Sequence, residues 1–266
     1  MATYAFGNAQ EIQRERLATL ASLFDPGTVA VLEPLGVGPG WRCLEVGAGG
    51  GSIASWLCER VAPDGSVVAT DLDATVLRDL SHPNLEVRVH DVVVDDLPFD
   101  EFDLVHLRLV LGWLREPRAV LERLVAALKP GGWLVAEEMD FVSAVPDPAM
   151  DPDTCARFER VVAAHNAALA AQSGFDSAYG RRVAGDLDAA GVVECGSAGR
   201  AFTWRGAEAG GRIWALTLVQ LREPMIATGL ADAADVDAIV ALSAHPRFRV
   251  VSPLVMAAWG RRPRTA

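Results

Sequence analysis

The 266-residue chain has very little lysine and tyrosine. Lys129 is its one lysine, and Tyr4 and Tyr179 are its two tyrosines. These residues form no Tyr-x-x-x-Lys pair, an arrangement that many nicotinamide-dependent oxidoreductases use in catalysis. The composition therefore argues against an oxidoreductase of that kind.

A basic patch is also missing. The formal net charge is −11, and arginines cluster only at residues 261–264, which we expect to be a solvated end. Proteins that bind nucleic acid neutralise its phosphates with basic residues. We therefore expect the partner to be a small molecule, and we expect binding to neither nucleic acid nor an anionic membrane. A homodimer is one possible assembly.

Long apolar runs and paired cysteines are absent as well. No run reaches the roughly 18 apolar residues of a membrane span, and the first residues lack the pattern of a signal peptide. The four cysteines form no CxxC pair and have no zinc-type spacing with histidine. We expect a cytoplasmic protein without a metal site, in which Cys43 and Cys58 are buried free thiols.

Short apolar strands alternate with helices over residues 41–138. Strands are expected at 41–46, 66–70, 85–90, 102–107 and 133–138, and helices at 52–61, 74–81 and 118–128. This rhythm is typical of a parallel sheet covered by helices on both faces. The expected fold class is α/β: a Rossmann-like, mostly parallel seven-stranded sheet with an antiparallel last strand and an added helical lid.

The segments outside this core are expected to be mainly helical. An apolar i, i+4 pattern predicts a helix at 9–24 that ends at Asp25-Pro26-Gly27, and a second helix follows at 28–35. Further helices are expected at 154–172, 180–190 and within 207–243, and an antiparallel strand pair at 192–204 and 248–259. The expected divisions are a lid (1–36), a core (37–140), a helical cap (141–190) and the end of the sheet (191–266) with a helical insertion (205–245).

A glycine-rich turn follows the first expected strand and opens the next helix. Gly47, Gly49 and Gly51 would let the backbone turn sharply beside a ligand, and the helix N-terminus would face an anionic group. Asp71 ends the next strand, about 20 residues on, where a carboxylate can take ribose hydroxyls. The register Gly49-x-Gly51-x-x-Ala54 also fits a dinucleotide fingerprint, and a plain tight turn is the third alternative.

Five segments in order resemble motifs of the class I S-adenosylmethionine-dependent methyltransferases. They are 44–51, 67–73, 90–92, 102–114 and 128–135. The last, which begins Leu-Lys-Pro-Gly-Gly, is the most specific, because NAD-binding folds do not usually carry it. The resemblance spans about residues 41–140. It implies methyl transfer from S-adenosylmethionine to a small molecule, as in bacterial secondary metabolism.

The resemblance also assigns cofactor contacts. The three glycines would contact the methionine part of the cofactor, with Glu45 and the backbone near Leu107 and Arg108 at its amino group. Asp71 would bind the ribose, Leu72 would lie on the adenine, and Asp91 and the Val92 N–H would bind the adenine edge. Core packing for Leu72 and Val92, and a solvated loop for Asp91, are the alternatives. Many relatives have histidine at the position of Trp113.

Arg16 is singled out by its place on the apolar face of the first helix. A buried arginine must pair or extend its head group to solvent. Arg16 could hold the cofactor carboxylate in a bidentate manner, or it could form a salt bridge at the rim.

Few residues could act as a general base. His106 ends the fourth expected strand and is the first candidate, and His165 in the helix after the fifth strand is the second. Glu137 and Glu138 alternate along a strand, so at most one should reach the pocket. The alternative is that the protein catalyses methyl transfer by positioning the reactants alone, without a general base.

The expected acceptor is a hydroxyl of an apolar or aromatic natural product. Two other functions remain open at this stage. The chain could be a non-catalytic cofactor-binding protein of the same fold, or an enzyme that uses the bound cofactor for another reaction, such as decarboxylation or cyclisation.

Overall fold

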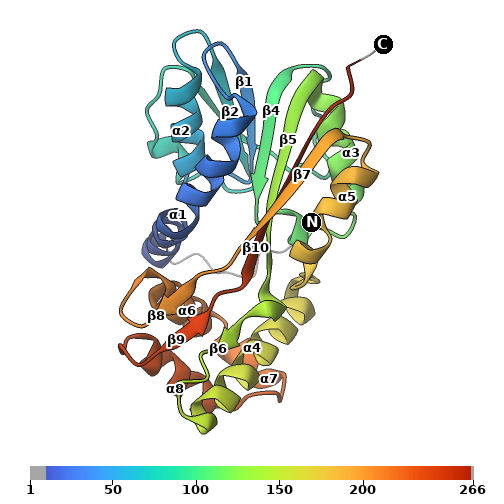
Figure 1. Cartoon of the computed structure of the whole chain (residues 1–266). Coiled ribbons are helices and arrows are strands. Elements are labelled where there is room, and N and C mark those ends of the chain that lie inside the picture. The colour runs from blue at the N-terminus through green and yellow to red at the C-terminus, as the bar shows by residue number, and fades with distance from the viewer. Residues whose placement is uncertain (1–9, 265–266) are drawn as a thin grey trace.

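The computed structural model describes residues 10–264, and its centre is a seven-stranded sheet (Figure 1). The strand order is β3 (Leu85–Val89), β2 (Ser66–Asp71), β1 (Arg42–Val46), β4 (Phe102–Arg108), β5 (Leu128–Asp140), β10 (Leu254–Arg261) and β7 (Val193–Arg200). The first five of these strands are parallel, and β10 runs antiparallel to both β5 and β7. The predicted α/β fold class, with its antiparallel last strand, is confirmed.

Helices cover both faces of this sheet because successive strand residues point to opposite sides. In β4, Leu104 packs with α1 (Gln10–Leu32) and α2 (Ser52–Val61). Its neighbour Val105 packs on the other face with α3 (Pro117–Ala127) and α5 (Val183–Ala189). His106 therefore lies on the face that α1 covers.

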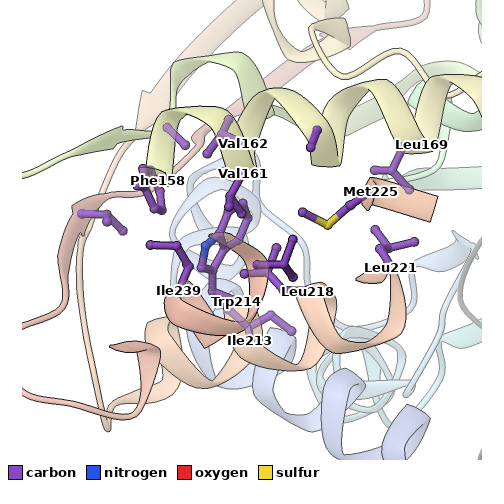
Figure 2. Close-up of a cluster of buried hydrophobic side chains, with 14 of the residues drawn as sticks. Phe158, Val161, Val162, Leu169, Ile213, Trp214, Leu218, Leu221, Met225 and Ile239 are labelled. Atoms are coloured by element: carbon purple, nitrogen blue, oxygen red, sulfur yellow. The ribbon is translucent and has the colours of Figure 1, made fainter. Parts of the chain in front are cut away.

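A helical cap extends from the carboxyl end of β5. It contains α4 (Pro152–Ser173), α6 (Ala209–Gln220), α7 (Arg222–Ala227) and α8 (Ala233–Ser243), with a small sheet of β6 (Val145–Pro146), β9 (Arg249–Val251) and β8 (Thr203–Arg205). Figure 2 shows the apolar interior of the cap, where Phe158 of α4 lies near Trp214 of α6. The long strands β5 and β10 connect core and cap (Figure 1). No helix in the described range is long and apolar enough to cross a membrane.

Three elements differ from the sequence-based prediction. The two helices predicted at 9–24 and 28–35 are one helix, α1, which continues through Pro26 and is followed by a 3-10 turn, η1 (Glu33–Leu35). Pro26 is exposed, while Phe24 and Thr28 on either side are buried, so packing of the helix outweighs the cost of proline.

The predicted helix at 74–81 is reduced to a single turn, η2 (Leu77–Asp79), before His82-Pro83. The two predicted C-terminal strands each divide between the sheets. At the division the Phe202 N–H donates to the Ser252 hydroxyl at 3.0 Å.

Candidate cofactor and acceptor site

The glycine turn lies at the carboxyl ends of the strands, between β1 and α2. Gly47, Gly49 and Gly51 have φ values of +67°, +55° and +76°. A Cβ atom at Gly47 would collide with Val110, and one at Gly51 would collide with Leu80. The turn therefore requires glycine, both for its backbone conformation and for the close approach of neighbouring segments.

Asp71, at the end of β2, is bonded directly to this turn. Its Oδ2 accepts from the Gly49 N–H at 2.9 Å, and its Oδ1 accepts from the Asp73 N–H at 3.1 Å. Burial raises the pKa of the Asp71 carboxyl despite these bonds. The glycines and the acid predicted to act together are thus adjacent.

The predicted adenine residues follow on the same edge. The His90 N–H donates to the Asp71 carbonyl at 3.0 Å, which places Asp91 beside the end of β2. The Asp91 side chain accepts from the Val93 N–H at 3.0 Å. Val92 is buried in the core, whereas Leu72 is 53% exposed and can cover a ligand.

The segment after β4 is held against the glycine turn by a buried acid that the sequence did not single out for this role. Oε1 of Glu138 accepts from the N–H groups of Val110 (2.9 Å) and Leu111 (2.6 Å). Burial raises the pKa of Glu138 to about 8, although these bonds oppose the shift. Leu109 has a positive φ of 60°, which turns the chain so that Val110 meets Gly47. The sequence offered one signal for this role, which is an acidic residue at the end of a strand with no basic residue directly after it.

Leu107 and Arg108 end β4 with side chains on opposite faces. Leu107 is fully buried among the residues that pack with α3 and α5, so only its backbone faces the ligand edge. The Arg108 guanidinium reaches α1, where it bonds to Asp25 at 2.9 Å and to the Thr28 hydroxyl at 2.8 Å.

His106 lies fully buried between two glutamates. Its Nδ1 is 2.6 Å from Oε2 of Glu45 in β1, and its Nε2 is 3.4 Å from Oε2 of Glu137 in β5. Burial would lower the pKa of His106, but attraction by Glu45 and Glu137 outweighs it and raises the pKa to about 9. Glu137 and Glu138 point to different places, as strand alternation predicts.

His165 lies in a different environment, in the interior of the cap. It is 1% exposed, and its ring centroid is 5.5 Å from Phe141 and 5.4 Å from Trp214. Its Nδ1 is 3.0 Å from Oδ1 of Asn166, and its Nε2 has no hydrogen-bond partner among the described residues. Burial first, and then the nearby charge of Arg16, lower the pKa of His165 to about 4.

Aromatic rings connect His165 to the segment after β4. Phe141 lies 5.7 Å from Phe175, and Phe175 lies 4.4 Å from Trp113, measured between ring centroids. Trp113 closes η3 (Leu111–Trp113), the turn that Glu138 holds. The rings thus run from His165 to the segment that covers Gly47.

Helix α1 borders both parts of the site. Leu17 packs against Gly49 and Gly50, while Arg16 is 9% exposed and lies near His165. The structure therefore brings together Arg16 and His165 on the cap side, and Gly47, Gly49, Gly51 and Asp71 on the sheet side. His106 and Glu45 lie beneath α1, away from His165.

The chain is similar to known methyltransferases over this region. Residues 44–134 match a family model described as a methyltransferase domain. Methyltransferase str2 of Strobilurus tenacellus is 36% identical over 116 residues, which are 42% of this chain and 41% of that protein. The ubiquinone/menaquinone biosynthesis C-methyltransferase UbiE of Bordetella parapertussis is 31% identical over 121 residues, 43% of this chain and 47% of that protein. The chain thus spans less than half the length of these relatives.

Solved structures share the fold over most of the chain. The phosphoethanolamine N-methyltransferase 2 of Haemonchus contortus, in complex with S-adenosyl-L-methionine, has a TM-score of 0.54 and 14% identity, covering 90% of this chain and 52% of that one. A putative methyltransferase of Bacillus halodurans has a TM-score of 0.55 and 15% identity, covering 88% of this chain and 98% of that one. Likeness at this identity is a likeness of fold.

Proposed function

We propose that residues 44–134 form a class I, S-adenosylmethionine-dependent methyltransferase domain, and that the chain methylates a hydroxyl group of a small apolar or aromatic molecule. One observation carries the choice of acceptor. The Nε2 atom of His165 is buried among aromatic rings in the interior of the cap, without a hydrogen-bond partner among the described residues.

The residues at the sheet edge fit S-adenosylmethionine. The glycine turn lies at the carboxyl ends of the strands, and Asp71 stands beside it with a carboxylate suited to ribose hydroxyls. Asp91 and the Val92 N–H would bind the adenine, and Leu72 would cover it. Glu45 and the backbone of Leu107 and Arg108 would meet the amino group, and Arg16 would meet the carboxylate. When bound, the cofactor supplies a methyl group already activated on a sulfonium.

His165 would bind the acceptor hydroxyl. Oδ1 of Asn166 can only accept, so Nδ1 of His165 carries the ring proton and Nε2 carries the lone pair. With its pKa lowered to about 4, the ring is neutral near pH 7 and accepts a hydrogen bond from an O–H group. The rings of Phe141 and Trp214 next to His165 favour a flat, apolar acceptor.

The chain contributes to the reaction mainly by positioning. Holding an acceptor oxygen in line with the methyl group can supply ~7–11 kcal/mol of the barrier. Helix α1 and the cap exclude water around that oxygen, which strengthens its interactions with the protein. His165 would contribute by orienting the acceptor hydroxyl, since a ring with a pKa of about 4 is a weak general base.

The cofactor site is tested by titration calorimetry of S-adenosylmethionine, S-adenosylhomocysteine and NADH, with Asp71→Ala as the variant. We expect micromolar binding of the first two ligands and binding at least tenfold weaker in the variant, because the ribose hydroxyls lose a carboxylate partner. His245→Gln, at an exposed position, is the control. Binding of NADH alone, or of none of the three, would contradict the proposal.

The acceptor is tested by release of S-adenosylhomocysteine with a panel of phenols, alcohols, amines and activated carbon acids. Turnover with phenols, and with none of the amines, is the expected result. Tight cofactor binding without turnover would favour the non-catalytic alternative, and conversion without loss of the methyl group would favour another reaction. We propose a cytoplasmic enzyme of bacterial secondary metabolism.

A further inference from the structure

Six ionisable side chains form one connected group between the sheet and α1. They are Asp25, Glu45, His106, Arg108, Glu137 and Arg200. Glu137 bonds to Arg200 at 2.5 Å and accepts from the hydroxyl of Thr28 in α1. Arg200 also donates to the Gly27 carbonyl, and Arg108 bonds to Asp25 and Thr28. The group therefore contacts the C-terminal half of α1 at positions 25, 27 and 28.

With its three carboxylates ionised, this group is neutral only when His106 is cationic. Asp25, Glu45 and Glu137 supply three carboxylates, and Arg108 and Arg200 supply two guanidinium groups. A cationic His106 brings the sum to zero. A neutral ring would leave an uncompensated negative charge beside side chains that are at most 5% exposed, which is costly.

The hydrogen bonds of His106 also indicate a protonated ring, independently of the sum of charges. Both ring nitrogens of His106 face carboxylate oxygens, and a carboxylate can only accept. A neutral imidazole has one N–H and would set a lone pair against the second carboxylate. The imidazolium donates to both, consistent with the raised pKa of His106.

We propose that His106 is a positioning residue, which as an imidazolium holds Glu45 in place for the cofactor amino group and, through Glu137 and Thr28, holds α1 over the glycine turn. This inference rests on the proposed function. Glu45 lies two residues before Gly47, so a shift of its carboxylate changes the entrance to the turn.

Helix α1 links the contacts of Glu137 and Thr28 to the glycine turn. Thr28 and Asp25 are anchored at one end, and Leu17 packs on Gly49 about 16 Å away along the helix axis. A helix moves as a stiff unit, so loss of the anchor loosens the cover of the turn. His106 itself has no free nitrogen for the acceptor.

The test compares the wild type with His106→Asn and Thr28→Val. We expect S-adenosylhomocysteine to bind about tenfold more weakly to His106→Asn, and amide exchange in residues 12–27 to be faster in both variants. Val61→Ala, which removes methyl groups from α2 on the same face, is the matched control. It should lower the melting temperature without changing the affinity.

Histidine side-chain NMR reports the protonation state directly. A signal that is absent from His106→Asn should remain imidazolium at pH 8 and titrate near pH 9. Because the pKa is raised above its unfolded value of about 6.5, this stabilisation is complete below pH 6.5 and is lost as pH rises through 9.

The outcomes separate this inference from the proposed function. If the wild type binds no S-adenosylhomocysteine, both are overturned. If the wild type binds it and His106→Asn binds it equally well, or if the signal of His106 is neutral at pH 7, only the positioning role is overturned.

Discussion

The pKa values of the two candidate histidines are shifted in opposite directions, although both side chains are buried. Carboxylates on each side raise the pKa of His106 to about 9, whereas apolar rings and the charge of Arg16 help to lower that of His165 to about 4. Burial alone disfavours the charged ring in each case, so the neighbours decide. At the scale of single residues, the first is suited to hold other groups and the second to accept a hydrogen bond.

Replacement of His165 by asparagine should therefore affect turnover more than cofactor binding. We expect kcat to fall by about tenfold, because the Nε2 lone pair that orients the acceptor hydroxyl is lost. The measurements are single-turnover kinetics with an accepted phenol and calorimetry with S-adenosylhomocysteine. An unchanged kcat would contradict this orienting role.

At the scale of elements, α1 is continuous where its sequence contains a helix breaker. Pro26 lacks the N–H that would bond to the Ser22 carbonyl, yet Phe24, Thr28 and Val31 are buried along the following turns. The Arg200 guanidinium lies against Gly27, where a Cβ would collide with it. Tertiary contacts from β7 and β5 thus hold the helix together at its weakest point.

Pro26→Ala should stabilise the protein, because Pro26 is exposed and the helix regains one backbone hydrogen bond. We expect the free energy of unfolding to rise by about 1–3 kcal/mol in urea titrations. Pro117→Ala, at the first position of α3 where proline is tolerated, is the control and should change little. A loss of stability in Pro26→Ala would mean that α1 needs its proline.

At the scale of the whole molecule, the core and the cap share their longest strands. Residues of β5 pair with β10 from Trp133 to Asp140, and these strands lead from the sheet into the cap (Figure 1). The site takes its glycine turn from the core and His165 from the cap. Separation of the core from the cap would break the pairing between β5 and β10 and would also divide the candidate site.

We therefore expect core and cap to unfold in one transition. Fluorine NMR of 5-fluorotryptophan protein, in which Trp56 reports on the core and Trp214 on the cap, should give the same urea midpoint for both signals. Variants Trp56→Phe and Trp214→Phe assign the signals. Two separate midpoints would show that the cap is an independent folding unit.

Local patterns in the sequence determined the fold class and the part of the candidate site that lies at the carboxyl ends of the strands. The glycine turn, Asp71 and the alternation of strands and helices were predictable, because the residues that define each feature are close in the chain or follow one period. The antiparallel β10 was predicted as well, since its apolar run is contiguous. The small second sheet was not, because it depends on pairing between distant short segments.

Only the tertiary structure decided the environments of the two histidines and the course of α1. Glu45, His106 and Glu137 come from three strands and are 61 and 31 positions apart, so nothing local joins them. Thr28 reaches Glu137 across 109 positions, and that contact helps carry α1 through Pro26. A pKa depends on the charges within a few ångströms, and a helix boundary depends on what the helix packs against, and both are properties of the folded chain.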